Sequence, residues 1–451
     1  MIGNKKIILA LLVAVIALTS LVGCSETAFQ EATGKGTINA INAMPASPTV
    51  GFLIEERALG SIGYKQSLGA QPFDDLSYTF NFEYRPLGAA AFTRFASQLI
   101  DMAADTDYTL VITGAVSAPV LTLWERPQRE WSGTETVFEV AFAHLSPALG
   151  NVDVYLAATG TLPVLGEERA KVSNGDRTAE IDVESEEVEI IITARDDPTT
   201  ILYQSYPIIL AARLSFTISI FDADPSIPAN ISVRAITSDG LNLELPDSNF
   251  LPTVRTVHLS LATANIDIFR DMDFTTPIFS DLGFGESSGD VPVPDGAFTY
   301  TYTAVGDPGT IIDAEDQLIS RGLRSSSYLV GDPLDELTRI FQLDDRRPIE
   351  THAKLRFVHA AVNHQTIDLY LATAGSDITD QSPTLPSLPF GFASSLSGTI
   401  AGSYDVVLTL PNDKTRLATY STIDLVNGDV AEVAIIDTVD PLVPDFIETR
   451  F

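Results

Sequence analysis

Apolar and polar residues alternate in short runs along most of the chain, and the same order of runs recurs four times. Each copy has a proline in an equivalent turn, and successive prolines are separated by 106, 108 and 108 residues: Pro119, Pro225, Pro333 and Pro441. Period-two alternation rich in β-branched and aromatic residues predicts β-strands, and clusters of Gly, Pro, Asn and Asp predict the turns between them. The pattern therefore predicts an all-β protein built from repeats.

Three strands are predicted in every copy. The strand before the proline turn is predicted at 108–113, 216–221, 327–330 and 431–436. The strand after the turn is predicted at 120–125, 231–236, 337–343 and 445–451. An earlier strand is predicted at 78–82, 188–193, 298–303 and 404–409. Stretches with helical periodicity are few, and the clearest are 89–104 and 314–321.

The repeat length favours four tandem immunoglobulin-like β-sandwich domains, with antiparallel strands, Greek-key connections and the copies strung in order. The expected boundaries are a signal peptide at 1–23, a lipidated tether at 24–35, and β-sandwich repeats at 36–134, 135–251, 252–350 and 351–451. Each copy is long enough to bury about 65% of its unfolded surface, so we expect each to fold alone. A propeller is the weaker alternative, because its blades are nearer to about 45 residues.

The N-terminus has the features of a bacterial lipoprotein signal. Lys5 and Lys6 precede an apolar run at 7–18, which is shorter than the roughly 20 residues of a spanning helix. The sequence Leu-Val-Gly-Cys follows at 21–24, so cleavage before Cys24 would free its thiol to carry a diacylglycerol. Ser25 stands where an Asp would retain a lipoprotein at the inner membrane. We expect export and lipid anchoring through Cys24 at the outer membrane of a Gram-negative bacterium, with a plain membrane anchor helix as the alternative.

Charge and cysteine content limit the partners. The chain has 60 acidic and 27 basic residues and a formal net charge of −33, which becomes −35 when Lys5 and Lys6 leave with the signal peptide. Such a surface repels nucleic acid and other acidic polymers. Cys24 is the only cysteine, so the exported part has no disulfide and must be stabilised by packed cores. No phosphate-binding Gly-rich loop, Cys-x-x-Cys pair or basic stripe occurs in the sequence.

A histidine followed nine residues later by an aspartate recurs in three copies. The pairs are His144 and Asp153, His258 and Asp267, and His359 and Asp368, while copy one has Asn42 and Gly51 at these places. Imidazole and carboxylate could form a metal site or an acid–base pair. Alternatively, a His bonded to a loop carbonyl or to its Asp would pin a turn between strands. We favour the structural interpretation, because zinc sites usually gather three or four ligands and only two recur.

The apolar phrase that ends in His and the Asp phrase that follows it resemble the bacterial and archaeal family named domain of unknown function 4397. The likeness is closest at 355–361, Leu-Arg-Phe-Val-His-Ala-Ala, leading to Ile-Asp-Leu-Tyr at 367–370. It is good in copies two and four, fair in three and weak in one. The resemblance implies a secreted or surface-attached β domain that often occurs in tandem. It implies no activity, since the family has no assigned catalytic residues.

Two further motifs could carry chemistry. Gly-Glu-Ser-Ser-Gly at 285–289 matches the Gly-x-Ser-x-Gly pattern of serine hydrolases, but Asp290 and two prolines follow where a nucleophile elbow needs a helix. Acidic groups suited to calcium occur at 196–197, 222 and 224, 271 and 273, 313–316, and 344–345. None follows the twelve-residue calcium loop, and turn-forming Asp is the simpler explanation. Calcium stays a candidate cofactor, and no other cofactor is expected.

The only two tryptophans, Trp124 and Trp131, flank the junction between copies one and two. Exposed, they would stack on sugar rings, and buried, they would join the two copies. We favour packing at the junction.

The leading interpretation is a non-enzymatic cell-envelope lipoprotein whose copies form a surface scaffold or binding module for an unidentified protein or polysaccharide. A tandem β array supplies reach and valency without chemistry. A calcium-dependent adhesin or glycan-binding protein is the alternative, and a hydrolase is the third. Nucleic acid is excluded as a partner by the charge.

Overall fold

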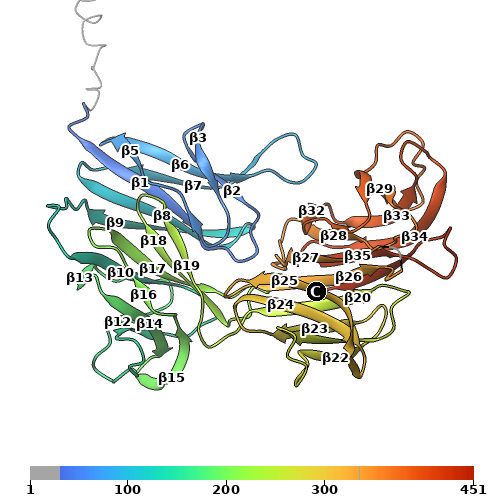
Figure 1. Cartoon of the computed structure of the whole chain (residues 1–451). Helices are drawn as coiled ribbons and strands as arrows, with labels where there is room; N and C mark the ends of the chain where they lie inside the picture. Colours follow the sequence, from blue (N-terminus) through green and yellow to red (C-terminus); the bar gives the residue numbers. More distant parts are fainter. Residues whose placement is uncertain (1–30, 335) are drawn as a thin grey trace, which may run out of the picture.

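The computed structural model describes residues 31–334 and 336–451, and these residues form strands, turns and loops without a helix. The signal peptide, Cys24 and most of the tether lie outside the described residues. The strands of copies one and two lie together, and those of copies three and four form a second group (Figure 1). We call copies one and two the first pair and copies three and four the second pair.

Each copy of the first pair forms two sheets, which we call inner and outer. In copy one the inner sheet contains β1 (Lys35–Asn42), β4 (Gln66–Ser67), β5 (Gln71–Asp74), β8 (Thr106–Ala115) and β9 (Ala118–Pro127). Its outer sheet contains β2 (Val50–Ile54), β3 (Arg57–Ile62), β6 (Ser77–Tyr84) and β7 (Thr93–Asp101). In copy two the inner sheet contains β10 (Val137–Leu145), β13 (Ile181–Glu184), β17 (Ser215–Asp222), β18 (Ile231–Thr237) and β19 (Asn242–Leu245). Its outer sheet contains β11 (Val152–Ala157), β12 (Ala170–Val172), β14 (Glu187–Ala194), β15 (Asp197–Gln204) and β16 (Ile208–Ile209).

The second pair repeats this arrangement. In copy three the inner sheet contains β20 (Thr253–Leu259), β23 (Ser287–Pro292), β26 (Arg324–Gly331) and β27 (Leu337–Leu343), and the outer sheet contains β21 (Ile266–Arg270), β22 (Phe279–Leu282), β24 (Gly296–Ala304) and β25 (Asp307–Ile319). In copy four the inner sheet contains β28 (Ala353–His359), β31 (Phe392–Ala393), β32 (Ser397–Thr399), β35 (Val430–Ile436) and β36 (Asp445–Arg450). Its outer sheet contains β29 (Thr366–Thr373), β30 (Leu385–Pro389), β33 (Gly402–Thr409) and β34 (Arg416–Leu425).

One parallel pairing occurs in every inner sheet, so the prediction of wholly antiparallel sheets was wrong. The first strand of a copy runs parallel to the strand before the proline turn, as in β1 beside β8 and β28 beside β35. Between these two strands the chain crosses to the outer sheet and returns, and it re-enters the inner sheet in its original direction. The strand after the turn then pairs antiparallel, so the proline turns are hairpin turns.

The predicted strands are confirmed in all four copies, and the two stretches with helical periodicity also contain strands. Residues 89–104 contain β7, and 314–321 overlap the end of β25. Both are edge strands whose only strand neighbours are β6 and β24. An edge strand with one solvated face has few buried positions, so burial does not force its apolar and polar residues to alternate. Its apolar residues can then fall at helical spacing by chance.

A separate apolar core fills the space between the inner and outer sheets of each copy. In copy four, for example, Leu355 and Val433 of the inner sheet meet Leu369 and Leu408 of the outer sheet. Corresponding cores occupy copies one, two and three. The Asp and His phrases of each copy therefore lie on different sheets, with a core between them.

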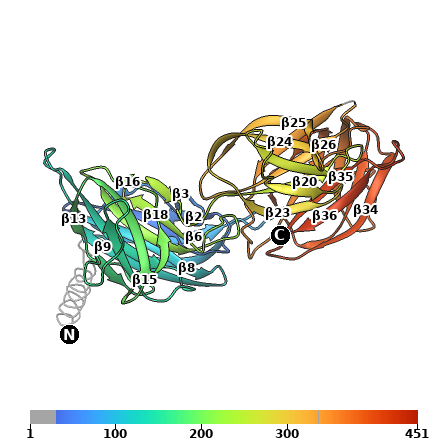
Figure 2. The ribbon, with the colours of Figure 1, turned by 60° about the horizontal axis from the view of Figure 1, so that its bottom comes forward.

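The inner sheets of each pair also pack against each other, so each pair has four layers in the order outer, inner, inner, outer. Ile41 and Val111 of copy one contact Leu145 and Phe221 of copy two in one apolar cluster. A second cluster joins copies three and four, and it includes Tyr328. The two stacks are seen side by side in Figure 2. The expectation that copies are strung one after another is thus replaced by face-to-face pairs.

Candidate functional site

The recurrent histidines are buried and bind the loop that follows the first strand. The ring of His144 is fully buried at the end of β10, and its Nε2 atom lies 2.8 Å from the carbonyl oxygen of Gly150. His258 contacts the carbonyl oxygen of Ala264 at 3.2 Å in the same way, and His359 contacts that of His364 at 2.8 Å. A carbonyl oxygen only accepts, so Nε2 carries the hydrogen in each ring. Each ring therefore holds its own loop.

Copy one builds the same loop with Asn42. Its side-chain oxygen accepts a hydrogen bond from the backbone N–H two residues later, at Met44, just as Nδ1 of His144 accepts from Ser146. Its amide nitrogen donates to Ser47 within the loop at 2.9 Å. Asn has an acceptor oxygen and an amide nitrogen with two donors, so it can replace the one donor and one acceptor of a neutral imidazole. The loss of His from copy one therefore leaves the turn intact.

Burial keeps these rings neutral. It lowers the pKa of His144 and His258, and it lowers the pKa of His359 to about 4, while the hydrogen bond to the loop carbonyl opposes the shift. Nδ1 of His144 accepts from the N–H of Ser146, and Nδ1 of His258 accepts from that of Ser260, whereas Nδ1 of His359 is buried without a hydrogen-bond partner in the described residues. Nε2 of each ring is committed to its loop, and a neutral ring held in this way has little capacity to exchange a proton at neutral pH.

The recurrent aspartates bind backbone N–H groups in neighbouring strands and turns, at residues with positive φ. Asp368 on β29 accepts hydrogen bonds from the N–H groups of Ser387 at 2.7 Å and Asn412 at 3.1 Å. Both residues are left-handed, with φ of 50° and 62°. A left-handed residue other than Gly is uncommon, so its amide needs a fixed partner to hold the turn. Equivalent bonds join Asp267 to Asp281 and Gly306, and Asp153 to Asp196.

The His and Asp of a copy do not form a pair. They lie on different sheets, and no hydrogen bond or ion pair joins them within residues 31–334 and 336–451. Across the same residues no group of three or more His, Cys, Asp or Glu side chains is placed to hold a metal ion. His352 and His364 lie near His359 in sequence, but the ring of His352 contacts Thr351, and His364 contributes its carbonyl oxygen.

The Gly-x-Ser-x-Gly segment lies where the chain crosses from the outer sheet to β23, an edge strand of the inner sheet. Ser287 begins β23, and the hydroxyl of Ser288 accepts the N–H of Thr256 at 2.9 Å. His258 contacts this segment only through its backbone, where its N–H donates to the carbonyl of Glu286. The segment therefore connects two sheets and is not the hairpin loop that its Gly and Ser residues suggest, and no helix follows it as a nucleophile elbow requires.

Most of the acidic groups singled out in the sequence serve turns and ion pairs, whereas Asp313 lies within β25 and has a buried oxygen without a hydrogen-bond partner in the described residues. Asp273 accepts hydrogen bonds from both the N–H and the hydroxyl of Thr275. Asp224 forms a buried ion pair with Lys65 of copy one at 2.9 Å. The carboxylates are thus used locally, and the ion pair with Lys65 joins copies one and two.

The two tryptophans have different surroundings. Trp124 packs against the apolar cluster between copies one and two. Trp131 is half-buried and stacks on the guanidinium of Arg129, whose carbon lies 3.8 Å from the ring centre. It borders a groove of about 430 Å³ that also contains Arg126 and Arg213.

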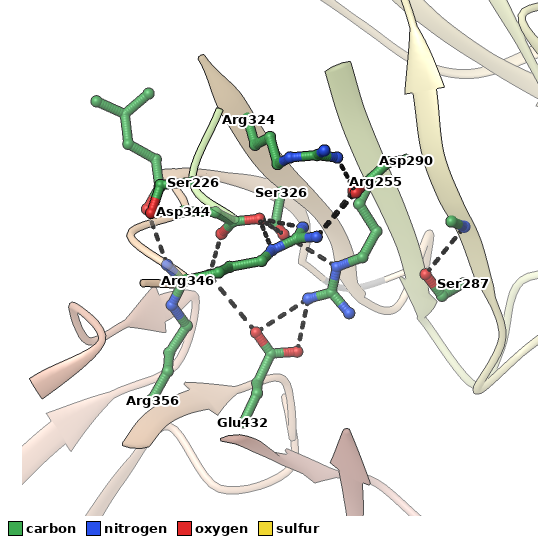
Figure 3. Close-up of polar contacts among 12 residues, drawn as sticks. Ser226, Arg255, Ser287, Asp290, Arg324, Ser326, Asp344, Arg346, Arg356 and Glu432 are labelled. Atoms are coloured by element: carbon green, nitrogen blue, oxygen red, sulfur yellow. Dashed lines mark hydrogen bonds and ion pairs between the residues drawn. The ribbon is translucent and has the colours of Figure 1, made fainter. Parts of the chain in front are cut away.

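A buried ionic network between copies three and four was not predicted. Arg255 of β20 binds both carboxylate oxygens of Glu432 on β35, at 2.9 and 3.0 Å (Figure 3). Arg356 of β28 is fully buried and binds Asp344 at 2.7 Å. Burial raises the pKa of Asp344, but Arg356 and Arg346 outweigh this effect and hold it below its usual value. The network joins the inner sheets of the second pair.

The first pair has small side chains at the same places. Arg255 and Arg356 each lie three residues before the histidine of their copies, and the corresponding residues are Asn39 and Ala141. Thr217 stands opposite Ala141, where Glu432 stands opposite Arg356. A cavity of about 30 Å³ lined by Asn39 and Thr217 is left at the centre of the first pair. An arginine within an otherwise buried strand was the available sequence signal for this network.

The expectations about the N-terminus concern residues outside the described ranges, so the lipobox and Cys24 are not described. Within residues 31–334 and 336–451, no helix is long and apolar enough to cross a membrane.

Comparisons with known proteins give a family without an assigned activity. No curated protein matches the chain. Among solved structures, the Bacillus anthracis TIE protein matches with 10% identity, covering 90% of this chain and 69% of that one, at a TM-score of 0.17. A likeness at this TM-score carries no argument about fold or function.

Two stretches match the family described as Domain of unknown function (DUF4397), at residues 36–155 and 252–370. Each match begins at the first strand of a pair and ends in the second strand of that pair's other copy. Copy one is matched in full although it lacks the His and Asp, and the matches end shortly after Asp153 and Asp368. Since the two stretches cover more than half of its residues, the chain belongs to the DUF4397 family.

Proposed function

We propose that the chain is a non-enzymatic cell-envelope lipoprotein that serves as a rigid scaffold or binding module for a protein or polysaccharide. The observation that carries this proposal is the use of the recurrent polar residues. His359 and Asp368 and their counterparts bind backbone groups, and the buried arginines bind carboxylates across the inner sheets. Residues committed in this way stabilise a framework, and they are poorly placed to bind substrate.

The framework has four repeats, and we propose that each is an immunoglobulin-like sandwich with its own core. The presence of two sheets and a separate apolar cluster in each copy supports this view. Binding then belongs to the loops and rims of the pairs, since loops carried by a rigid framework usually make the contacts of such proteins.

The lipid on Cys24 would hold the framework at the outer membrane of a Gram-negative cell. The lipobox at 21–24 and Ser25 support this placement. The variant Cys24→Ser tests the anchor, since it should remove lipid and leave the chain unprocessed or released. An unchanged processed mass in the membrane fraction would contradict lipid attachment.

The scaffold role is tested by affinity capture from solubilised cell envelopes, with the exported chain immobilised. We expect specific retention of one protein or polysaccharide in the presence of EDTA. Retention that requires calcium would instead support the calcium-dependent adhesin. Turnover of envelope material without stable retention would contradict a non-enzymatic role.

A further inference from the structure

One junction joins the two pairs end to end. We call the end of a pair that carries the His or Asn loops and the proline turns its turn end, and the opposite end its base. At the junction, Arg347 from the linker between copies three and four donates to the carbonyl oxygens of Pro45 and Ser47, at 2.9 and 2.7 Å. Glu350 donates its N–H to Ala46 at 2.8 Å and accepts from the N–H of Val116. The base of the second pair thus occupies the turn end of the first.

The linker is well buried there. Ile349 lies between these polar contacts with 2% of its surface exposed. The N–H of Arg347 donates to the hydroxyl of Ser226 at 3.1 Å, and Arg324 donates to the carbonyl of Ile227 at 3.2 Å. Both copies of the first pair therefore contribute to this seat.

The second pair has the same turn end, and nothing in the described chain covers it. Asn42 corresponds to His258, so Pro45 and Ala46 correspond to Leu261 and Ala262. These two residues border a hollow of about 390 Å³, together with Val362 of copy four.

The turns around the hollow are apolar and exposed. Leu334 and Val439 are each 96% exposed, and Leu442 is 75% exposed. By the equivalent prolines Pro225 and Pro441, Leu442 corresponds to Ser226, whose hydroxyl accepts the N–H of Arg347 in the occupied seat. Exposed aliphatic residues gathered at one end of a molecule commonly mark an interaction surface.

The first pair, in turn, has a base with the residue types of the docked linker. Trp124 of β9 and Gln342 of β27 occupy equivalent positions in their copies. Trp124 pairs with Thr109, and Gln342 pairs with Ser326, in the corresponding antiparallel pairing. Arg129 and Arg347 each follow that position by five residues, and Trp131 and Ile349 by seven. Glu135 and Glu350 each precede the histidine of the next copy by nine residues. An arginine, a large apolar residue and a glutamate thus recur in the same order.

The charge match between the two ends rests on one arginine. At the base of the first pair, Arg126 and Arg129 already form ion pairs with Asp107, Glu139 and Asp182, whereas Arg213 donates to the carbonyl oxygen of Gly133 and forms no ion pair within the described residues. Asp332 and Asp437 border the hollow at the turn end of the second pair, and Asp440 lies on the neighbouring turn. Opposite charges on two surfaces favour their encounter.

We propose that a second copy of this chain binds at the free turn end, through the base of its first pair. The contact repeats the internal junction between two molecules, so it joins unlike surfaces head to tail. Such a contact leaves one free end on each side and extends into a linear chain of molecules. It concerns self-association, and it does not depend on the proposed scaffold role.

Sedimentation velocity of residues 31–451 tests the proposal. At physiological salt the Debye length is about 8 Å, so repulsion between the acidic chains is screened. We expect the weight-average sedimentation coefficient to rise with concentration from about 1 to about 300 µM and to pass the value of a dimer, as an open-ended association in the micromolar range requires. A monomer over the whole range, or a limit at the dimer, would overturn the proposal.

Two variants locate the contact. The double variant Val439→Asp with Leu442→Asp alters exposed residues at the turn end, and Trp131→Asp alters the base; each should weaken association at least tenfold when alone. An equimolar mixture should form one heterodimer and nothing larger, because only one intact turn end and one intact base remain. Absence of the heterodimer would refute the contact, provided that both variants keep the parent's β circular dichroism spectrum. The matched control Leu162→Asp, at an exposed loop position elsewhere, should associate as the parent does.

Discussion

Replacement of His359 by Ala should destabilise the second pair selectively. The ring is fully buried, and its Nε2 group donates to the carbonyl oxygen of His364 at 2.8 Å. Alanine removes this donor and leaves a carbonyl of the loop without its partner, which costs about 1–3 kcal/mol. For a urea dependence of about 2 kcal/mol/M, the unfolding midpoint should fall by roughly 0.5–1.5 M.

The matched control is His359→Asn, because copy one holds the same loop with Asn42. Asparagine retains a donor and an acceptor, so it should recover part of the loss. If Asn and Ala are equally destabilising, the hydrogen bond is not the cause and lost ring packing against Phe390 explains the effect.

The positions of the tryptophans give the assay its selectivity. Trp124 and Trp131 both lie in the first pair, so their fluorescence reports its unfolding, whereas circular dichroism reports all strands. We expect the urea transition seen by fluorescence to stay in place while part of the circular dichroism transition shifts. A common shift in both signals, or a loss below about 0.5 kcal/mol in the Ala variant, would refute the assignment of His359 as a local structural residue.

Four further outcomes are expected. Asp368→Asn should cost about 1–3 kcal/mol in urea unfolding, since an amide can accept only one of the two N–H groups of Ser387 and Asn412 well; a neutral effect would contradict their dependence on the carboxylate. Folding lowers the pKa of His359 from 6.5 to about 4, so the stability that its neutral form contributes is present above pH 6.5 and is lost as the pH falls toward 4. The loss amounts to about 3 kcal/mol over the whole window. The stability advantage of the parent over His359→Asn should therefore shrink between pH 6.5 and 4 and stay constant above pH 6.5. Titration with calcium or zinc should leave the melting temperature unchanged, and a shift abolished by His359→Ala would favour a metal site instead. A fragment of residues 252–451 should be folded and monomeric at low concentration, whereas 351–451 should aggregate or unfold, because it exposes the face of β28 and β35 that copy three covers; a stable, soluble 351–451 would show that pairing is dispensable.

The strands and the repeat could be predicted from sequence because each depends on local residue patterns. Runs rich in β-branched and aromatic residues mark the strands, and each proline turn marks a hairpin between two inner-sheet strands. The loop function of His359 was foreseen as one of two interpretations, since its spacing to Asp368 fits a turn. The nine-residue spacing of His and Asp was compatible with positions across a hairpin or on two sheets, and spacing alone cannot distinguish a hairpin from a crossover between sheets.

The pairing of copies could not be predicted because its determinants are distant in sequence. All seven residues of β28 are buried, including Lys354 and Arg356, since sheets cover it on both faces. From the sequence of copy four alone, Arg356 is expected to face solvent. It is buried because the inner sheet of copy three packs on this face of β28. The partners Arg255 and Glu432 are 177 residues apart, so no local pattern connects them.

The residues between the two inner sheets differ between the first and second pairs, and this difference favours the correct pairing of copies during folding. Four similar repeats in one chain invite misassembly, in which an inner sheet docks on the wrong neighbour. If copy two met copy three, Arg255 would face the position of Thr217 and lose Glu432, leaving a buried charge that costs about 3–5 kcal/mol. The correct partners avoid this penalty. The buried charges thus favour the pairing of copy three with copy four over its pairing with copy two.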